Sequence, residues 1–184
     1  MSPRRFVLID RDGTLNVERD YLSDPAGLEL IPGAAEGLRL LRQLGFGLAV
    51  ITNQSGIARG YFTPKDLDSI HARLAELLKY EEITLDGVYI CPHGPDDDCD
   101  CRKPLPGLAL QAAAELGFDP SQAFVIGDKA VDVDLGRAVG AKTILVRTGY
   151  GKGYEGKCQP DHVADDLLAA ARWIALQVKG GDGI

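Results

Sequence analysis

Short apolar segments alternate with longer amphipathic segments along most of the chain. Five segments rich in Val, Ile and Leu have the length and composition of buried strands, and they are residues 5–10, 46–52, 86–91, 123–128 and 142–147. Amphipathic segments predict helices at residues 33–44, 64–79, 107–117, 130–139 and 165–178. Residues 13–32 form an irregular stretch within the first crossover. This alternation predicts an α/β fold with a central, mostly parallel sheet.

Local signals place several of the helix boundaries. Thr63 precedes Pro64 and is followed three residues later by Asp66, which is the arrangement of a capped helix start. Gly45 and Gly117 stand where helices are expected to end.

Composition and charge narrow the class of protein. The 184 residues suffice for one domain, and we expect a single domain over residues 1–184 with a flexible tail at 179–184. A net charge of −7 argues against general nucleic-acid binding, although a local cluster of cations could hold a small phosphorylated ligand. No apolar run approaches the about 18 residues of a membrane helix, so we expect a cytoplasmic protein, and we take a monomer as the default.

Polar side chains gather where the predicted strands end. The first strand is followed by DRDGT at residues 10–14, and the second ends in TNQSG at residues 52–56. Arg and Lys at 102–103 follow the third strand after a cysteine-rich loop, and Asp and Lys at 128–129 follow the fourth. Because ligands bind at the carboxyl ends of strands in open α/β sheets, these residues predict a site at one edge of the sheet.

Asp10 and Asp12 are the strongest candidates for chemistry at this edge. They are two residues apart, so both can face the same way in an extended backbone. A lone pair of this kind often only starts a turn, but a carboxylate at the end of a buried strand is costly unless it is paired or ligated. With Asp128 as a further oxygen ligand, the pair predicts a Mg²⁺ site, because Mg²⁺ prefers a few carboxylates together with water and phosphate.

Three cysteines and a histidine fall within CPHGPDDDCDCRKP at residues 91–104. The four candidate ligands are Cys91, His93, Cys99 and Cys101. Three thiolates and one imidazole suit a tetrahedral Zn²⁺, although an acidic loop with incidental cysteines is the alternative. Four protein ligands leave no position for water, so the predicted zinc is structural. It would stiffen the loop that carries Arg102 and Lys103.

The order of these motifs resembles the haloacid dehalogenase-like (HAD) phosphatases over nearly the whole chain. DRDGTLN, a strand ending in TNQSG, the RKP lysine and GDKAVDVD follow one another on successive strands, as the four motifs of that family do. The resemblance implies a HAD-like Rossmannoid three-layer sandwich with a central, mostly parallel sheet and a zinc-stabilised loop. The segments between the motifs leave no room for a cap domain, so the expected site is open.

The resemblance also implies a role for the motif residues. Asp10 is expected to attack phosphorus and form an aspartyl-phosphate, and Asp12 to protonate the leaving oxygen and then deprotonate water. Mg²⁺ is expected on the Asp10 carboxylate, the Asp12 carbonyl and Asp128, with Asp132 nearby. Arg11 receives no role. The remaining residues expected to contact the phosphoryl group or the substrate beside it are Thr52, Asn53, Arg102 and Lys103.

The zinc loop is similar to one branch of the family, which contains both heptose 1,7-bisphosphate phosphatases and histidinol-phosphate phosphatases. TNQSGIARGYF at residues 52–62 and LVRTGYGK at residues 145–152 resemble the heptose enzymes, so removal of the 7-phosphate is the favoured activity. By this resemblance the residues that line the substrate site are Glu18, Arg19, Asp20, Tyr21, Thr52, Asn53, Gln54, Ser55, Arg102, Lys103 and Lys129.

Other interpretations stay open at this point. Histidinol-phosphate phosphatase is the alternative activity, and a non-catalytic, zinc-stabilised binding module is the alternative class. Arg59 could meet a second phosphate or be a surface residue, and Cys158 is taken as an ordinary residue. The sequence leaves the anomer of the sugar undetermined.

Overall fold

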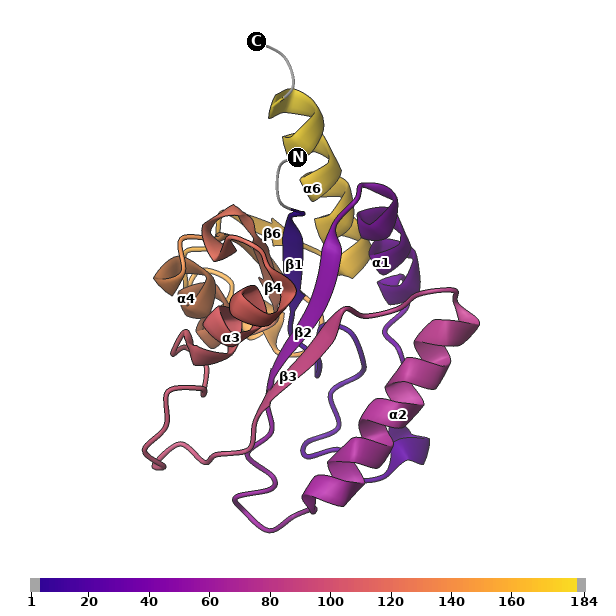
Figure 1. Ribbon diagram of the computed structural model, residues 1–184, viewed down its shortest axis with the longest axis vertical. Helices are drawn as coiled ribbons and strands as arrows, with labels where there is room; N and C mark the ends of the chain where they lie inside the picture. Colours follow the sequence, from indigo (N-terminus) through magenta and orange to yellow (C-terminus); the bar gives the residue numbers. More distant parts are fainter. Residues whose placement is uncertain (1–3, 182–184) are drawn as a thin grey trace.

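The computed structural model of the chain describes residues 4–181, and its strands form one parallel sheet in the order β3-β2-β1-β4-β5-β6 (Figure 1). The strands are β1 (Phe6–Ile9), β2 (Gly47–Asn53), β3 (Gly87–Cys91), β4 (Phe124–Gly127), β5 (Lys142–Val146) and β6 (His162–Ala164). The helices are α1 (Ala34–Gln43), α2 (Pro64–Tyr80), α3 (Gly107–Leu116), α4 (Ala130–Ala138), α5 (Gly151–Tyr154) and α6 (Leu167–Gly181). The predicted α/β fold with a parallel sheet is confirmed.

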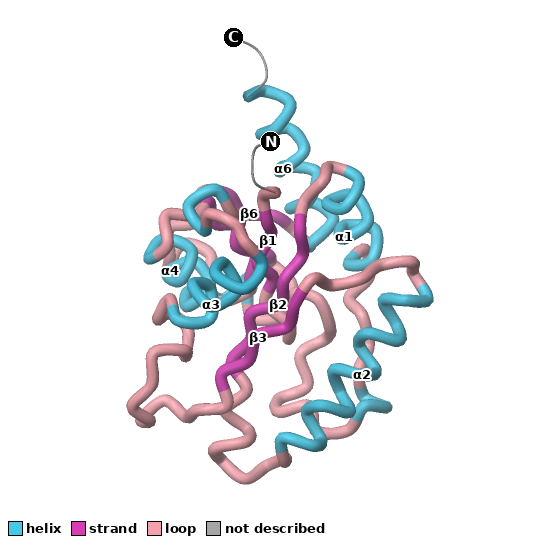
Figure 2. The backbone as a smooth tube through the Cα atoms, in the orientation of Figure 1, coloured by secondary structure: helices cyan, strands magenta, loops and turns pink. Residues whose placement is uncertain are grey.

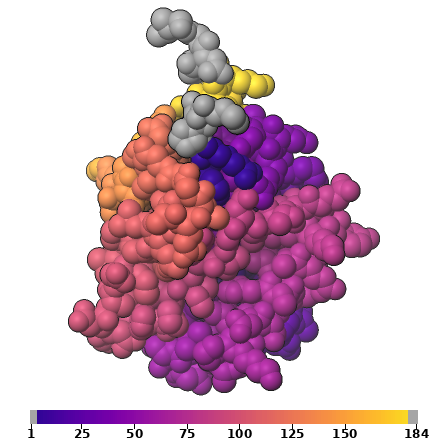
Figure 3. Space-filling model, in the orientation of Figure 1, coloured from indigo at the N-terminus to yellow at the C-terminus, as the bar shows by residue number. Residues whose placement is uncertain are grey.

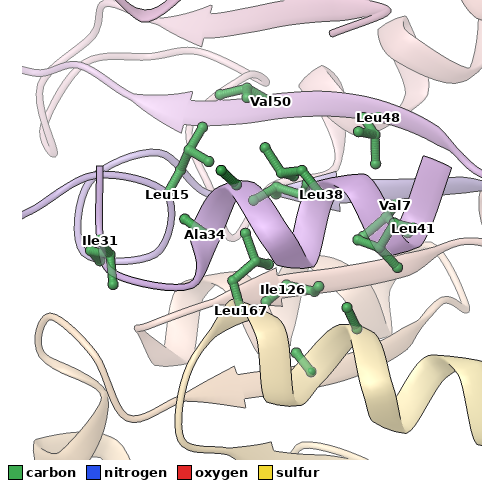
Figure 4. Close-up of a cluster of buried hydrophobic side chains, with 14 of the residues drawn as sticks. Val7, Leu15, Ile31, Ala34, Leu38, Leu41, Leu48, Val50, Ile126 and Leu167 are labelled. Carbon is green, nitrogen blue, oxygen red and sulfur yellow. The ribbon is translucent and has the colours of Figure 1, made fainter. Parts of the chain in front are cut away.

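Helices cover both faces of the sheet (Figures 1 and 2). The side chains of α1, α2 and α6 share one buried cluster with one face of the strands, and those of α3 and α4 share a second cluster with the other face. Figure 4 shows the first cluster, in which Leu41 of α1 lies beside Val7 of β1 and Leu167 of α6 lies near Ile126 of β4. This three-layer arrangement explains why β1, β2, β4 and β5 are nearly continuous apolar runs.

Each predicted strand and helix has a counterpart, with ends that agree to within three residues. The capping signal at the start of α2 is confirmed, because Asp66 N–H donates to Thr63 Oγ1 while Thr63 N–H donates to the Asp66 carboxylate. The sequence analysis missed β6 and α5, which have three and four residues and are too short for a periodic pattern. The predicted tail begins at 179, but α6 continues to Gly181, and residues 182–184 lie outside the described residues.

The order of strands places one crevice at the centre of the sheet. The chain moves outward from β1 through β2 to β3, then returns to pair β4 with the other side of β1. The loops after β1 and β4 therefore leave in opposite directions and open a gap between them, which is where open α/β sheets bind ligands. Asp10 follows β1 and Asp128 follows β4, so both stand at this point.

Insertions around the site are short in the described residues. Residues 13–32 contain a 3₁₀ turn at Pro25–Gly27 and two isolated bridges through Asn16, and the connection from β2 to β3 holds α2 alone. No segment there is large enough to form a cap domain, as expected. None of the helices formed by residues 4–181 combines the length and the apolar character that crossing a membrane requires.

Candidate active site and cysteine-histidine cluster

A cavity of about 370 Å³ opens at the carboxyl ends of the strands. In Figures 1 and 3 the loops that follow β2 and β3 lie at this end of the molecule, away from α6. The predicted site residues that line the cavity are Asp10, Asp12, Glu18, Asp20, Tyr21, Thr52, Asn53, Gln54, Ser55, Arg102, Lys103 and Lys129. The fold thus brings together residues that lie more than 110 positions apart in the sequence.

Two predicted contacts lie elsewhere. The guanidinium of Arg19 pairs with Glu29 at 2.8 Å on the surface and is not part of the cavity lining, so the structure does not place Arg19 on a ligand there. Arg59 lies over the ring of Tyr21 at 5.8 Å and also falls outside the lining.

Lys103 joins two carboxylates at the floor of the cavity. Its side chain is 3% exposed, and Nζ donates to Asp10 Oδ1 at 2.6 Å, to Asp132 Oδ1 at 2.7 Å and to the carbonyl of Ile51 at 2.8 Å. Burial by itself lowers the pKa of Lys103, but the charges of Asp10 and Asp132 outweigh burial and raise it. Lys103 is therefore a fixed cation beside Asp10.

Three buried carboxylates, those of Asp10, Asp128 and Asp132, have oxygens within 4.8 Å of one another. Burial raises the pKa of Asp10 well above its ordinary value, and the neighbouring Asp132 and Asp128 raise it further against the opposing charge of Lys103. Burial also raises the pKa of Asp128 to about 6, against a hydrogen bond from the Tyr150 N–H. The cluster holds more negative charge than Lys103 alone balances, which favours binding of a further cation.

One oxygen of Asp128 is available for such a cation. Oδ2 accepts the Tyr150 N–H at 2.8 Å, whereas Oδ1 is buried and has no hydrogen-bond partner in the protein. Gly13, with φ +87°, and Gly149, with φ +55°, approach this carboxylate so closely that a Cβ on either would collide with it. The backbone therefore encloses Asp128 tightly, and the position requires glycine on both sides.

The loop after β2 connects the floor of the cavity to the cysteine-rich loop. Gln54 Nε2 donates to Thr52 Oγ1 at 2.8 Å and to Asp12 Oδ2 at 2.9 Å. Asn53 makes two hydrogen bonds with the backbone of Lys103, accepting its N–H at 3.0 Å and donating to its carbonyl at 3.2 Å. Asn53 thus fixes the backbone that carries Lys103, a contact that the sequence analysis did not foresee.

Arg11 is a second residue whose place the sequence did not reveal. It is 1% exposed and donates to both oxygens of Asp12, from Nε at 3.1 Å and from Nη2 at 3.0 Å. Burial alone raises the pKa of Asp12, but the charge of Arg11 and hydrogen bonds from Asn16, Arg11 and Gln54 together lower it. A signal was present, since an arginine between two aspartates at the end of a buried strand needs a partner.

The rim of the cavity mixes aromatic rings with charges. Lys129 Nζ lies 3.5 Å from Glu18 Oε2 and 4.8 Å from the centre of the Tyr150 ring. The hydroxyl of Tyr150 donates to Asp20 Oδ1 at 2.6 Å, which ties the loop after β5 to the loop after β1. The sequence analysis did not assign Tyr150 or Tyr154 to the site, although both line it.

The cysteine-histidine cluster forms as the spacing predicts. One ligand atom from each of Cys91, His93, Cys99 and Cys101 lies within 4.8 Å of the others. The sulfur of Cys91 is 3.6 Å from His93 Nδ1 and 4.0 Å from the sulfur of Cys99. Ligands at about 2.0–2.3 Å from a tetrahedral Zn²⁺ lie about 3.5–3.8 Å from one another, close to these two separations. The sulfur of Cys101 lies closer, at 2.8 Å from the sulfur of Cys91 and 3.2 Å from His93 Nδ1, so the four atoms would spread slightly around an ion. Cys158 takes no part, and its sulfur contacts the carbonyl of Tyr154.

Arg102 links this cluster to the cavity. Its Nη1 donates to the carbonyl of His93 at 3.2 Å, and Arg102 directly follows Cys101 in the chain. The N–H of Gln54 donates to the carbonyl of Cys91 at 2.7 Å, so the loop after β2 is also tied to the first cysteine. The cluster therefore fixes the loop that brings Arg102 and Lys103 to the cavity.

Comparison with known proteins finds relatives that are HAD-like phosphatases. A HAD-hydrolase-like family model matches residues 100–170. The D-glycero-beta-D-manno-heptose-1,7-bisphosphate 7-phosphatase of Pseudomonas aeruginosa is 42% identical, covering 91% of this chain and 96% of its own. The D-glycero-D-manno-heptose-1,7-bisphosphate 7-phosphatase of Chlorobaculum tepidum is 43% identical, covering 96% of both chains.

Solved structures agree with these sequences. A D,D-heptose 1,7-bisphosphate phosphatase from B. bronchiseptica, solved with magnesium and phosphate, superposes with a TM-score of 0.88. It is 32% identical and covers 94% of this chain and 99% of its own. A HAD-like phosphatase from Mesorhizobium loti superposes with a TM-score of 0.78 at 33% identity, covering 93% of this chain and 87% of its own.

Proposed function

Because the chain belongs to the HAD-like phosphatase family that includes the heptose-1,7-bisphosphate 7-phosphatases, we propose that it hydrolyses the 7-phosphate of D-glycero-D-manno-heptose 1,7-bisphosphate. The products are heptose 1-phosphate and inorganic phosphate, on the route to nucleotide-activated heptose. The observation that carries the phosphatase chemistry is the position of Asp10, which lies 2.6 Å from Lys103 at the floor of the cavity. The sugar follows from relatives that match over more than nine-tenths of the chain.

The carboxylate cluster fits the Mg²⁺ that this family uses. The Asp10 and Asp128 carboxylates and the Asp12 carbonyl would hold the ion, and the unpartnered Oδ1 of Asp128 supports this assignment. A bound Mg²⁺ would offset the repulsion among the three carboxylates and polarise the phosphoryl oxygens. The ligand set has few protein groups, as suits an ion that keeps water and substrate in its shell.

The chain's own residues carry the bond changes in two steps. The Asp10 carboxylate attacks phosphorus and forms an aspartyl-phosphate, while the bond from phosphorus to the sugar oxygen breaks and Asp12 gives that oxygen a proton. Asp12 then takes a proton from a water molecule, which attacks phosphorus and releases inorganic phosphate. The second step regenerates Asp10 as a carboxylate and Asp12 as an acid.

Three groups would bind the phosphoryl oxygens in this proposal. Thr52 Oγ1 accepts from Gln54, so its own proton remains free to donate to the substrate. The backbone N–H of Asn53 is the second group, and the ammonium of Lys103 is the third. All three N–H groups of Lys103 have partners in the protein, so the N–H that donates to Asp10 would donate to the bound phosphoryl group instead. Donors fixed in advance stabilise the charge that spreads over these oxygens in the transition state.

The rim supplies groups for the sugar and the second phosphate. Arg102 and Lys129 are the cations at the rim of the cavity, and Glu18, Asp20 and Tyr21 line the same opening. An open site without a cap has to recognise its substrate through such short loops. The second phosphate therefore meets Arg102 or Lys129 rather than Arg19, which is turned toward Glu29.

We assign a structural Zn²⁺ to the cysteine-histidine cluster. The four side chains supply a complete tetrahedral set and leave no position for a reactive water. Thiols of this kind persist in a reducing compartment, which supports a cytoplasmic location as part of this proposal. A monomeric state is likewise proposed, and light scattering after gel filtration would test it.

The direct test is phosphate release with Mg²⁺ from three substrates: the α and β anomers of heptose 1,7-bisphosphate, and histidinol phosphate. We expect turnover of a heptose bisphosphate to exceed that of histidinol phosphate by at least about 100-fold in kcat/KM, a difference of about 2.7 kcal/mol. The preferred anomer assigns the pathway. A preference for histidinol phosphate would keep the chemistry of Asp10 and overturn the proposed sugar.

A further inference from the structure

We propose that Arg11, braced by His71 of α2, is a positioning residue that fixes the orientation of the Asp12 carboxylate for proton transfer. The proposal rests on the function proposed above, in which Asp12 is the acid and then the base. Among the described residues of the cavity lining, the Arg11 side chain hydrogen-bonds only to Asp12, and His71 lies outside that lining.

The contact between Arg11 and Asp12 is bidentate. Nε of Arg11 donates to Oδ2 at 3.1 Å, and Nη2 donates to Oδ1 at 3.0 Å. Arg11 is 1% exposed and is among the largest fully buried side chains of the described residues. A planar guanidinium that grips both oxygens fixes the plane of the carboxylate, which a point charge such as a lysine ammonium does not do.

His71 holds the far side of the guanidinium. Nη1 of Arg11 lies 3.0 Å from His71 Nε2. An arginine only donates hydrogen bonds, so Nε2 must be the acceptor and the imidazole must be neutral. The pKa of His71, lowered to about 4 by burial and by the charge of Arg11, agrees with a neutral ring. His71 therefore orients Arg11 much as Arg11 orients Asp12.

Asp12 receives two further donors, and these differ in kind. Asn16 Nδ2 donates to Oδ1 at 3.0 Å, and Asn16 is fully buried. Gln54 Nε2 donates to Oδ2 at 2.9 Å, and Gln54 lines the cavity. With two donors on each oxygen, the acceptor capacity of the carboxylate is filled. Asp12 can therefore exchange a proton with substrate or water only by releasing one contact.

The contact from Gln54 is the one that opens toward the cavity. Arg11 and Asn16 can keep the carboxylate in place while Gln54 releases Oδ2 and retains its second partner, Thr52. This arrangement explains why a buried, charged side chain stands at position 11, where an apolar residue could otherwise fill the space. A buried ion pair alone is weak evidence for stability, so a role in orientation is the better account.

The test measures the variant Arg11→Met on substrates with two different leaving groups. Methionine has nearly the volume of the arginine side chain but lacks the hydrogen-bond donors of the guanidinium. With heptose bisphosphate the leaving group is a sugar alkoxide that needs the proton of Asp12, whereas p-nitrophenolate leaves from p-nitrophenyl phosphate without one. We expect the single-turnover rate on heptose bisphosphate to fall by about 10- to 100-fold. The burst rate of p-nitrophenol release should stay within about threefold of wild type, since Asp10 is untouched.

Matched variants separate orientation from simple loss of packing. Arg11→Lys keeps the charge but not the bidentate grip, and we expect it to recover at most about a third of the lost rate. His71→Gln can offer its amide oxygen to Arg11 and should stay within about threefold of wild type, whereas His71→Leu should lose more on the heptose substrate than on p-nitrophenyl phosphate. If Arg11→Met does not fold, the two His71 variants carry the test.

The outcomes distinguish this inference from the proposed function. An active wild type with Arg11→Met at the same rate on heptose bisphosphate would overturn the role of Arg11. Equal losses on both substrates would also overturn it, because they would indicate damage to Asp10 or to the fold. If the wild type hydrolyses another alkyl phosphate instead, that substrate replaces heptose bisphosphate in the comparison and only the proposed sugar fails. If it hydrolyses no phosphate monoester, the proposed function fails, and this inference fails with it.

Discussion

The carboxylate cluster and the cysteine-histidine cluster are both suited to metal ions, yet they are built in opposite ways. Asp10, Asp128 and Asp132 come from two strand ends and a helix, 122 positions apart at their extremes, and all three are buried. The four residues of the other cluster lie within eleven positions, at the end of β3 and in the loop that follows it. The first needs the whole sheet in order to exist, whereas the second needs only a short piece of chain.

The difference extends to charge and coordination. The carboxylate cluster keeps an unpartnered oxygen on Asp128 and opens to a cavity, so an ion there has room for water and substrate. The cysteine-histidine cluster offers four protein ligands and closes around its ion. The molecule thus keeps the site suited to a catalytic Mg²⁺ apart from the site suited to a structural Zn²⁺. Lys103 connects the two sites. Lys103 lies two residues after Cys101 in the chain and contacts Asp10 in space.

The largest effect should come from Asp10→Asn, which removes the nucleophile. We expect kcat to fall by at least about 1,000-fold, because an amide cannot form the aspartyl-phosphate. The midpoint of thermal unfolding should stay within about 5 °C of wild type, since one of three repelling carboxylates is lost together with one partner of Lys103. Phosphate release and calorimetry measure the two quantities, and retained turnover would show that Asp10 is not the nucleophile.

A smaller effect is expected when the other cluster is opened by Cys99→Ser. Zinc content should fall below one ion per chain, and kcat should fall by about 10-fold because Lys103 and Arg102 lose their support. The affinity for Mg²⁺ should change little, since no ligand of that site is altered.

Cys158→Ser is the matched control, because Cys158 lies outside the cluster. This variant should retain both zinc and activity. Metal analysis and steady-state kinetics measure the outcome. A zinc-free Cys99→Ser protein with unchanged kinetics would separate the loop from the chemistry.

His71 should make the free energy of unfolding depend on pH. Burial and the charge of Arg11 lower the pKa of His71 from 6.5 to about 4 in the folded protein. Between these values the unfolded chain binds a proton that the folded chain does not, so this contribution to stability is lost as pH falls. Between about pH 7 and pH 5 the loss is roughly 2 kcal/mol.

The variant His71→Gln has no such group, so its free energy of unfolding should fall by about 2 kcal/mol less than that of wild type over the same interval. Urea unfolding at both pH values measures this difference. Identical pH slopes for the two proteins would contradict a neutral, half-buried His71.

The smallest effect is expected for Arg19→Ala. Arg19 pairs with Glu29 on the surface, outside the cavity, so KM and kcat for the heptose substrate should change by less than about twofold. Tyr21→Ala is the comparison, because Tyr21 lines the cavity and its loss should raise KM more than the loss of Arg19. A large rise in KM for Arg19→Ala would mean that its side chain turns toward the substrate when one binds.

Much of the fold was accessible from the sequence, for identifiable reasons. The strands β1, β2, β4 and β5 are covered by helices on both faces, so they are apolar runs that stand out from their surroundings. The segment β6 has three residues and gave no such signal, because a strand that short has no period to detect.

The sequence by itself determined what depends on neighbouring residues. The ligands of the cysteine-histidine cluster lie close together because they are close in the chain. Asp10 and Asp12, two residues apart directly after β1, both line the cavity. These features follow from the covalent geometry of a short segment. A reading of the residues in order is therefore enough to find them.

Only the tertiary structure decided which partners these residues have. It turned Arg19 away from the cavity, joined Asn53 to the backbone of Lys103 and placed His71 of α2 against Arg11, 60 positions earlier. Such contacts depend on how helices and loops pack across the sheet, and the same side chains could satisfy their charges and hydrogen bonds in many other ways. The pattern of residue types does not choose among those ways, because burial and proximity arise only when distant segments meet.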